Sequence, residues 1–419
     1  MIASIRKSRS GLSRLLSIAL FMTTCSLSSL AQSGGSSYSS LNLGDLETIT
    51  NGVAAGRAGV ETAVPSVVQL NGLNPAAWSS LTFVSIQTAL SFEQYNVSSA
   101  ESSLWQNRVS LKSFSVGLPA SRTKGFTIGL GVRPLTTVNY ATASDILVPN
   151  VDTVVSGTRT SNGSGGVSEG FVGASYRPFS WLSVGASLGI QFGASTELTR
   201  FEINSSNYNE AAIDNTTRYS GISGSFGVIV QPIDKLSIGA AITPPSTLNA
   251  ETISLGLFRE GVSDDTLNID TTEITHAIPL RMTVGASYQI GRTLLSGDLL
   301  LQSWAGSSTL DNTRNRMRTA IGIDYLPNTS AGSRGTDRWT LRAGLWREQT
   351  YVMVDDVGVD AMGISLGGSI PFSPTAHLGS GAGIDLGIEL GTRGSTENGH
   401  SKELFGKLTL GLLINEMWF

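Results

Sequence analysis

Apolar residues alternate with small or polar residues along much of this chain, from residue 82 to its end. In the clearest stretch, residues 182–192, the even-numbered positions are Leu, Val, Ala, Leu, Ile and Phe, and Ser, Gly and Gln lie between them. A period of two is the pattern of a β-strand, whose successive side chains point to opposite faces. No apolar run reaches the roughly 18 residues that a membrane-spanning helix needs. The pattern therefore predicts an all-β fold.

The alternating segments predict about fourteen strands, an even number as bacterial single-chain barrels require. We expect strands near 82–93, 105–118, 126–140, 167–177, 181–203, 217–231, 235–253, 279–289, 293–304, 315–326, 338–350, 361–371, 381–392 and 404–416. Several match the roughly 9–11 residues that cross a bilayer at a tilt. Tight turns alternate with longer polar segments at 141–166, 204–216 and 254–278. This arrangement predicts a transmembrane antiparallel β-barrel whose long segments are external loops.

The composition is typical of such a wall. Charged residues make up 14% of the chain and 48 of its 419 residues are Gly, against about 25% and 7% in average proteins. Because alternate residues of a strand point to opposite faces, the alternation also predicts which side chains face lipid. We expect these side chains to include Ala186, Leu188, Ile190, Ile384, Leu386, Ile388 and Leu412.

The first 31 residues have the features of a secretory signal peptide. Four basic residues precede a short apolar core, and Ser29-Leu30-Ala31 fits the rule for cleavage after a small residue. The alternative, lipidation of Cys25, rests on Thr23-Thr24-Cys25, a poor lipobox. Cleavage after Ala31 leaves no cysteine and 24 basic against 32 acidic residues, a net charge of −8. This charge argues against a nucleic-acid partner.

The chain stops on Met417-Trp418-Phe419, at the end of an alternating strand. A terminal aromatic residue in this position is typical of bacterial outer-membrane barrels, in which the last strand is read by the barrel-assembly machinery. We therefore expect the bacterial outer membrane as the location, with its lipid and that machinery as partners.

Residues 32–81 do not alternate and are rich in Ser, Gly, Ala and Asn. They form either a disordered leader or a plug in the lumen. Val67, Val68, Leu70, Leu73 and Trp78 are apolar enough to favour the plug. The predicted domains are thus a signal peptide (1–31), an N-terminal hatch (32–81) and a transmembrane β-barrel (82–419).

Two motifs resemble the FadL family of outer-membrane channels. Residues 56–63, Gly-Arg-Ala-Gly-Val-Glu-Thr-Ala, precede Asn74-Pro75-Ala76, and this stretch is similar to the Gly/Ala-rich hatch of that family. Residues 278–304, which begin Ile-Pro-Leu-Arg and end in Trp, resemble paired strands of the same family. The resemblance implies a fourteen-stranded barrel closed by its hatch.

The same resemblance implies passive uptake of hydrophobic compounds such as long-chain fatty acids, with lateral exit beside an interrupted third strand. Here Arg133-Pro134 follows the alternating residues of that strand, and proline cannot donate to a ladder. Pro134 marks either a lateral gate or merely the outer end of the strand. A second class of function stays open, that of a FadL-like barrel that acts as a secretion-system partner or shuttle. The polar outer segments suit that role equally well.

In the second half of the chain, many charged residues share the parity that we assign to the lumen. They should point inward, because an Arg that faces lipid at mid-bilayer costs about 2–4 kcal/mol. They pair with one another and with the hatch, or some bind a ligand carboxylate. The candidate ligand-binding residues are Arg316, Arg318, Arg342, Trp304, Trp346 and Phe405.

Catalysis has little support in the sequence. The three histidines, His276, His377 and His400, are far apart and fall in predicted loops or turns. There is no phosphate loop and no paired-cysteine metal spacing. We therefore expect neither an enzyme nor a cofactor or metal.

Overall fold

The computed structural model describes residues 34–99, 102–149, 154–204, 210–260, 263–306, 309–310, 312–328, 335–372, 381–397 and 400–416. The expected signal peptide, Cys25, His377 and Met417-Trp418-Phe419 lie outside the described residues.

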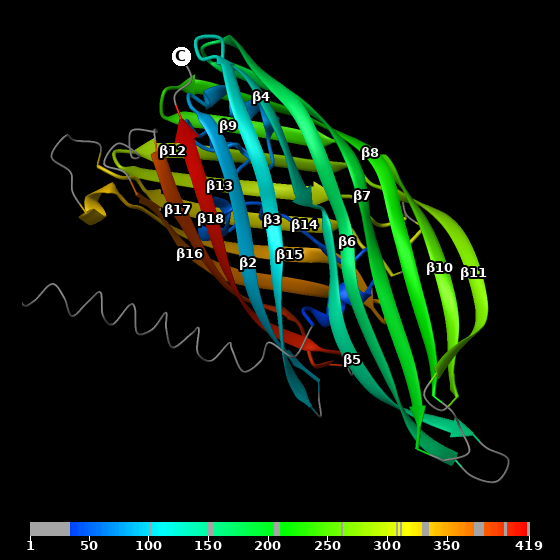
Figure 1. Ribbon diagram of the computed structural model, residues 1–419. Coiled ribbons are helices and arrows are strands. Elements are labelled where there is room, and N and C mark those ends of the chain that lie inside the picture. Colours follow the sequence, from blue (N-terminus) through cyan, green and yellow to red (C-terminus); the bar gives the residue numbers. More distant parts are fainter. Residues whose placement is uncertain are drawn as a thin grey trace, which may run out of the picture.

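The described chain forms one closed antiparallel barrel (Figure 1). Its strand segments are β2 (Val84–Ser98), β3 (Ser103–Ser121), β4 (Phe126–Pro134), β5 (Thr136–Pro149), β6 (Val154–Phe179), β7 (Leu182–Ile203), β8 (Ala211–Ile233), β9 (Leu236–Thr243), β10 (Ser246–Glu260), β11 (Ser263–Ile278), β12 (Arg281–Ile290), β13 (Thr293–Gln302), β14 (Arg316–Tyr325), β15 (Thr340–Val354), β16 (Val357–Pro371), β17 (Gly381–Gly394) and β18 (Lys402–Glu416). β18 pairs with β2 from Lys402↔Ser98 to Glu416↔Val84, which closes the wall.

Three pairs of segments, β4 with β5, β9 with β10 and β11 with β12, are each one interrupted strand, so the wall has fourteen strands, as predicted. The interruptions fall at Leu135, at Pro244-Pro245 and at Pro279-Leu280. Two of them carry proline, which has no N–H to give to a ladder. The first lies directly after Pro134 of the same strand.

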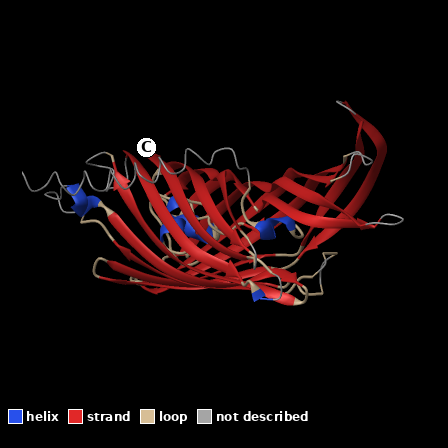
Figure 2. Ribbon diagram, turned by 90° about the horizontal axis from the view of Figure 1, so that it is seen from below, coloured by secondary structure: helices blue, strands red, loops and turns tan. Residues whose placement is uncertain are grey.

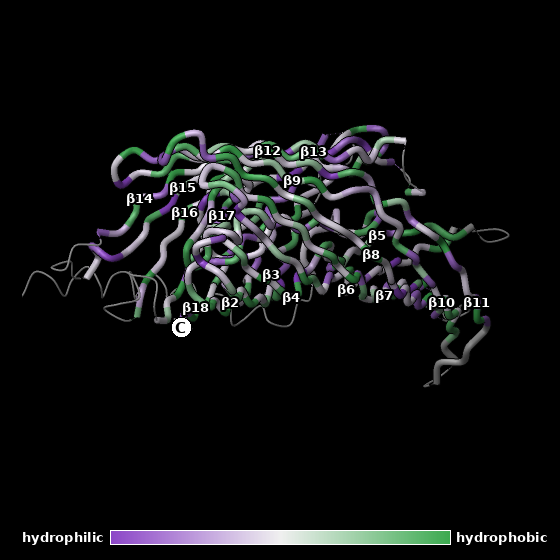
Figure 3. Tube along the Cα trace, turned by 90° about the horizontal axis from the view of Figure 1, so that it is seen from above, coloured by the Kyte–Doolittle hydropathy of each residue, from purple (hydrophilic) through white to green (hydrophobic). Residues whose placement is uncertain are grey.

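Apolar and polar residues alternate along the strands (Figure 3). Of the predicted lipid-facing set, Ala186, Leu188, Ile190, Ile388 and Leu412 are exposed on the outer face, and Ile384 and Leu386 are half-buried. Residues of the opposite parity, such as Ser183, Ser287 and Thr409, are buried inside. The assignment of the two faces is confirmed, and it is the arrangement of a transmembrane barrel.

The three polar segments predicted as external loops are mostly strand. Their residues extend β5, β6, β7, β8, β10 and β11 well beyond the interruptions and form a raised wall on one side of the barrel (Figure 1). The loop prediction was wrong because alternation of apolar and polar residues is needed only where one face meets lipid. Strands outside the bilayer keep their ladder while both faces stay polar. His276, predicted in a loop, lies in β11.

The N-terminal segment, residues 34–83, lies inside the barrel (Figure 2). It holds η2 (Ser37–Ser40), β1 (Asp45–Leu46), α2 (Gly52–Gly56) and η3 (Pro75–Ser80); η4 (Gly335–Arg338) lies outside, between β14 and β15. The Asn51 side chain caps α2 by accepting from the Ala54 N–H at 2.8 Å. None of the helices in the described residues is sufficiently long and apolar to span a membrane.

Candidate functional site

The hydrogen-bonded ladder of the wall has an opening between β3 and β5. The ladder from β3 to β4 ends at Phe114↔Val132, one residue before Arg133-Pro134. Among the described residues no ladder pair joins β5 to β3, although both continue beyond this point. Gln106 Nε2 donates across the opening to the Ala141 carbonyl at 2.8 Å. Pro134 itself still pairs with Ser168 of β6.

The N-terminal segment occupies the edge of β5 that β3 leaves free. Asp45 and Leu46 of β1 pair with Thr137 and Thr136 of β5. The Glu47 N–H donates to the Leu135 carbonyl at 2.9 Å. The segment therefore takes the place of a neighbouring strand at the level of the interruption.

Two ionic clusters hold this part of the segment. In the first, Glu47 bonds Lys112 at 2.9 Å, and Glu93 bonds both Lys112 and Arg108 at 2.7 Å. These four side chains are 0–9% exposed. The Lys112 and Arg108 charges hold the pKa of Glu47 below its usual value, although burial alone would raise it.

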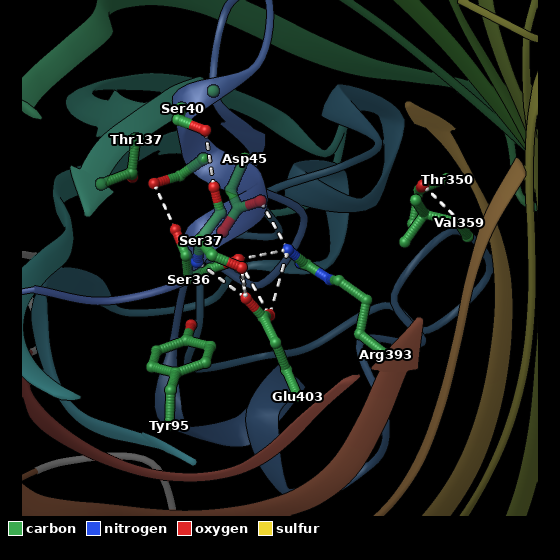
Figure 4. A network of polar contacts seen from close by, with 12 residues as sticks. Ser36, Ser37, Ser40, Asp45, Tyr95, Thr137, Thr350, Val359, Arg393 and Glu403 are labelled. Atoms are coloured by element: carbon green, nitrogen blue, oxygen red, sulfur yellow. Dashed lines mark hydrogen bonds and ion pairs between the residues drawn. The ribbon is translucent and has the colours of Figure 1, made fainter. Parts of the chain in front are cut away.

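In the second cluster, Glu403 of β18 accepts hydrogen bonds from the N-terminal segment (Figure 4). The donors are Ser36 Oγ at 2.9 Å, Ser37 N at 2.7 Å and Ser37 Oγ at 2.8 Å. Arg393 of β17 reaches Asp45 at 2.7 Å and Ser36 Oγ at 2.8 Å. Neither cluster was identified from the sequence, because each joins the N-terminal segment to two wall strands, β2 and β3 in the first and β17 and β18 in the second.

Asn74-Pro75-Ala76 caps η3 and lies against the wall near the short turns. The Asn74 side chain accepts from the Ala76 N–H at 3.0 Å and donates to the Thr62 carbonyl at 2.8 Å. Its amide also lies 3.3 Å from two wall carbonyls of β8 and β9. Gly227 faces this amide, and Gly185 of β7 faces Pro75, each leaving no room for a Cβ.

Cavity A lies where the three strand interruptions meet the lumen and has a volume of about 70 Å³. Its apolar lining comes from the N-terminal segment and from five parts of the wall: Leu43, Leu46, Leu135, Val167, Leu248, Ile278 and Trp304. Its charged lining consists of Glu47, Arg133, Glu169, Arg281 and Arg316. Arg133 is held by Glu169 at 2.7 Å and donates to the Gly72 carbonyl.

The six candidate residues divide among three cavities. Trp304 and Arg316 line cavity A. Arg318, Trp346 and Phe405 line cavity B, of about 80 Å³, on the other side of β1. Arg342 lines cavity C, of about 500 Å³. The candidates therefore do not form one site.

The three candidate arginines, Arg316, Arg318 and Arg342, all have carboxylate partners. Glu348 accepts from Arg316 at 2.7 Å and from Arg318 at 2.8 Å, and Arg318 also lies 4.1 Å from the Trp346 ring. Asp324 accepts from Arg342 at 3.1 Å. The prediction that lumen charges pair with one another and with the N-terminal segment is confirmed, since Asp324 also holds Arg57 at 2.9 Å.

Arg281 differs from these arginines. Its guanidinium Nη2 donates to Thr243 Oγ1 at 3.1 Å, and among the described residues no carboxylate lies within ion-pair distance of it. It lines cavity A together with Arg133 and Arg316. The alternation along its strand predicts that Arg281 faces the lumen. The sequence does not show that Arg281 differs from the paired arginines in lacking a nearby carboxylate.

Asp298 and Glu61 meet where α2 continues toward η3. Asp298 Oδ2 accepts from the Glu61 N–H at 2.7 Å and from the Thr62 N–H at 2.8 Å. The Glu61 carboxyl accepts a hydrogen bond from Asn51 Nδ2 at 2.8 Å. Burial raises the pKa of Glu61, partly offset by that bond and by Arg57. No group of three or more potential metal ligands occurs among the residues that the structure describes.

Solved structures share this fold. CymD, described as a monoaromatic hydrocarbon channel, superimposes with a TM-score of 0.59 at 14% identity, covering 90% of this chain and 99% of that one. A Pseudomonas aeruginosa FadL homologue gives 0.58 at 14%, covering 90% and 100%. The Pseudomonas putida toluene transporter TodX gives 0.59 at 14%, covering 90% and 100%. At these identities the likeness establishes a FadL-like fold, as the motifs implied.

None of the curated proteins matches the chain significantly. A family model does: BamG matches residues 13–419. Since the match spans nearly the whole sequence, the chain belongs to the BamG family.

Proposed function

We propose that this protein is a channel in the bacterial outer membrane for the passive uptake of hydrophobic compounds, long-chain fatty acids among them. Cavity A carries the proposal. It combines an apolar lining with the guanidinium of Arg281, which has no carboxylate within ion-pair distance among the described residues, at the level where the wall strands are interrupted. CymD, a monoaromatic hydrocarbon channel, and TodX, a toluene transporter, support the same class of cargo.

In this proposal Arg281 selects compounds that carry a carboxylate. The planar guanidinium presents two parallel N–H groups that match a carboxylate, and such charge-assisted hydrogen bonds are stronger than neutral ones. Because about 70 Å³ is too small for a fatty-acid chain while β1 is docked, the apolar chain of the same molecule would contact Val167 and Trp304 once β1 leaves the edge of β5. Neither contact requires a cofactor or a chemical step.

The exit in this proposal is lateral, through the opening between β3 and β5. An apolar molecule that enters water loses about 25 cal/mol per Å² of its surface, so a path directly into lipid avoids that cost. The N-terminal segment acts as the hatch, because β1 occupies the edge of β5 and the rest of the segment lies inside the barrel. Arg133 and Pro134 lie at the gate.

Binding of dodecanoate and of its methyl ester to the purified protein tests the proposal. Arg281→Met should weaken dodecanoate about 10- to 150-fold, from the 1.5–3 kcal/mol of hydrogen bonds to a charged group, and leave the ester unchanged. Arg347→Met, at a guanidinium whose side chain is 66% exposed, is the matched control. Failure of the parent protein to bind either compound would exclude this cargo.

A second candidate is an interaction protein, such as a secretion-system partner or shuttle. This role is favoured by the shape of the lumen. β1 lies between cavities A and B, both of which are lined by Leu46 and Glu47, and both cavities are small. Retention of dodecanoate by liposomes that contain the protein, without transfer, would favour this role over transport.

A further inference from the structure

The raised wall ends in β11, and along residues 268–275 the outer edge of this strand has no partner strand among the described residues. β11 pairs with β10 along its whole length, from Ser246↔Ile278 to Glu260↔Ser263. For residues 268–275, which the structure describes with their side chains, all ladder pairs among the described residues are with β10. At the base a loop approaches, where Thr309 Oγ1 lies 2.8 Å from His276 Nδ1 and 3.5 Å from the Thr275 carbonyl oxygen. Half of the backbone N–H and C=O groups of this stretch therefore face outward.

This edge lacks the usual protection. Natural sheets shield an edge with Pro, Lys, a short strand or a covering segment. β11 is 16 residues long, contains no Pro and no Lys, and is exposed on both faces from residue 268 to 275. Ile269 and Ile274, of opposite parity, are 65% and 45% exposed. The strand thus presents an apolar side chain on each face beside an open row of hydrogen-bonding groups.

The charge of the wall indicates what the edge would accept. β11 contains four acidic residues and no Lys or Arg: Asp264, Asp265, Asp270 and Glu273. Residues 138–149, 154–165, 195–203, 211–220, 249–260 and 263–275, which make up the raised wall, contain ten acidic and four basic residues, a net charge of −6. An acidic field attracts a basic partner over several ångströms.

We propose that the outer edge of β11 is a docking site for a positively charged, extended polypeptide segment of another protein, which adds to the raised wall as a further strand. Its backbone would pair with the free N–H and C=O groups of β11, as in other strand additions. Its basic side chains would lie beside Asp270 and Glu273, and its apolar ones would cross-pair with Ile269 or Ile274.

The probe is a labelled 12-residue peptide of repeated Lys-Lys-Thr-Thr, which presents Lys on both faces when extended, and its binding to the detergent-solubilised full chain is followed by fluorescence anisotropy. A peptide of repeated Glu-Glu-Thr-Thr should not bind. Asp270→Lys with Glu273→Lys should weaken the Lys peptide about tenfold and create affinity for the Glu peptide. Glu202→Lys with Asp214→Lys makes the same charge change on β7 and β8, away from the edge, and should weaken the Lys peptide less than threefold.

Backbone pairing is tested with Thr271→Pro and Thr272→Pro. Adjacent residues of a strand direct their N–H groups to opposite sides, so one substitution removes an outward donor and the other a donor to β10. The outward one should abolish peptide binding while the barrel keeps its folded mobility in gels. Equal losses from the edge and control charge reversals, or binding that neither proline variant reduces, would overturn the proposal.

Discussion

Gly227→Ala should release the N-terminal segment from the wall. A Cβ at this position would overlap the Asn74 amide oxygen and lie 3.1 Å from Pro75 Cδ. Asn74 is fully buried, with its amide bonded to the Thr62 carbonyl at 2.8 Å and its oxygen to the Ala76 N–H at 3.0 Å. Displacing it loses about two hydrogen bonds and leaves a buried carbonyl unsatisfied, at about 2–4 kcal/mol. That corresponds to about 30- to 1,000-fold in the docking equilibrium.

Maleimide labelling of Ala77→Cys measures this equilibrium, because Ala77 is 1% exposed when η3 is docked. When opening is fast, the labelling rate follows the undocked population even if that population is small. Gly224→Ala is the matched control on the same strand, since its Cβ would meet nothing closer than 3.8 Å. It should label within threefold of the parent. A Gly227→Ala protein that folds and labels at the parental rate would refute the reasoning.

Three further predictions concern the segment and the gate. Deleting residues 32–81 should raise the ion conductance of the protein in planar bilayers, because the described part of this segment lies buried in the lumen; unchanged conductance would mean that it is no plug. Protonation of Glu61 should stabilise docking, since its pKa is raised in the buried state: the gain is complete below its ordinary value of 4.5 and is lost as pH rises through the raised value. Proteolysis of the segment should therefore slow on acidification, and Glu61→Gln should remove this pH dependence. Pro134→Val, which supplies an N–H where the β3–β4 ladder stops, should slow the uptake of a labelled fatty acid by cells at equal protein level.

The sequence by itself determined the class of fold and the faces of its strands. A side chain's face in a strand depends only on parity, so Leu188 and Ile190 were placed outside, and Arg316 and Arg318 inside, without any tertiary information. Turn residues and strand lengths are likewise properties of short stretches of sequence, and they were enough to predict the number of strands, fourteen. Pro134 marked the end of the β3–β4 ladder for the same reason, because a missing N–H is a property of one residue.

What only the tertiary structure decided depends on contacts between residues far apart in the chain. Periodicity could not show that the polar segments beyond the bilayer stay paired as a raised wall, since strands exposed to water on both faces carry no alternation. Nor could parity distinguish Arg281 from Arg316: both point inward, but Glu348 lies beside only one of them. A carboxylate partner is set by the register of neighbouring strands and by the course of the N-terminal segment. Both are fixed only when the barrel closes.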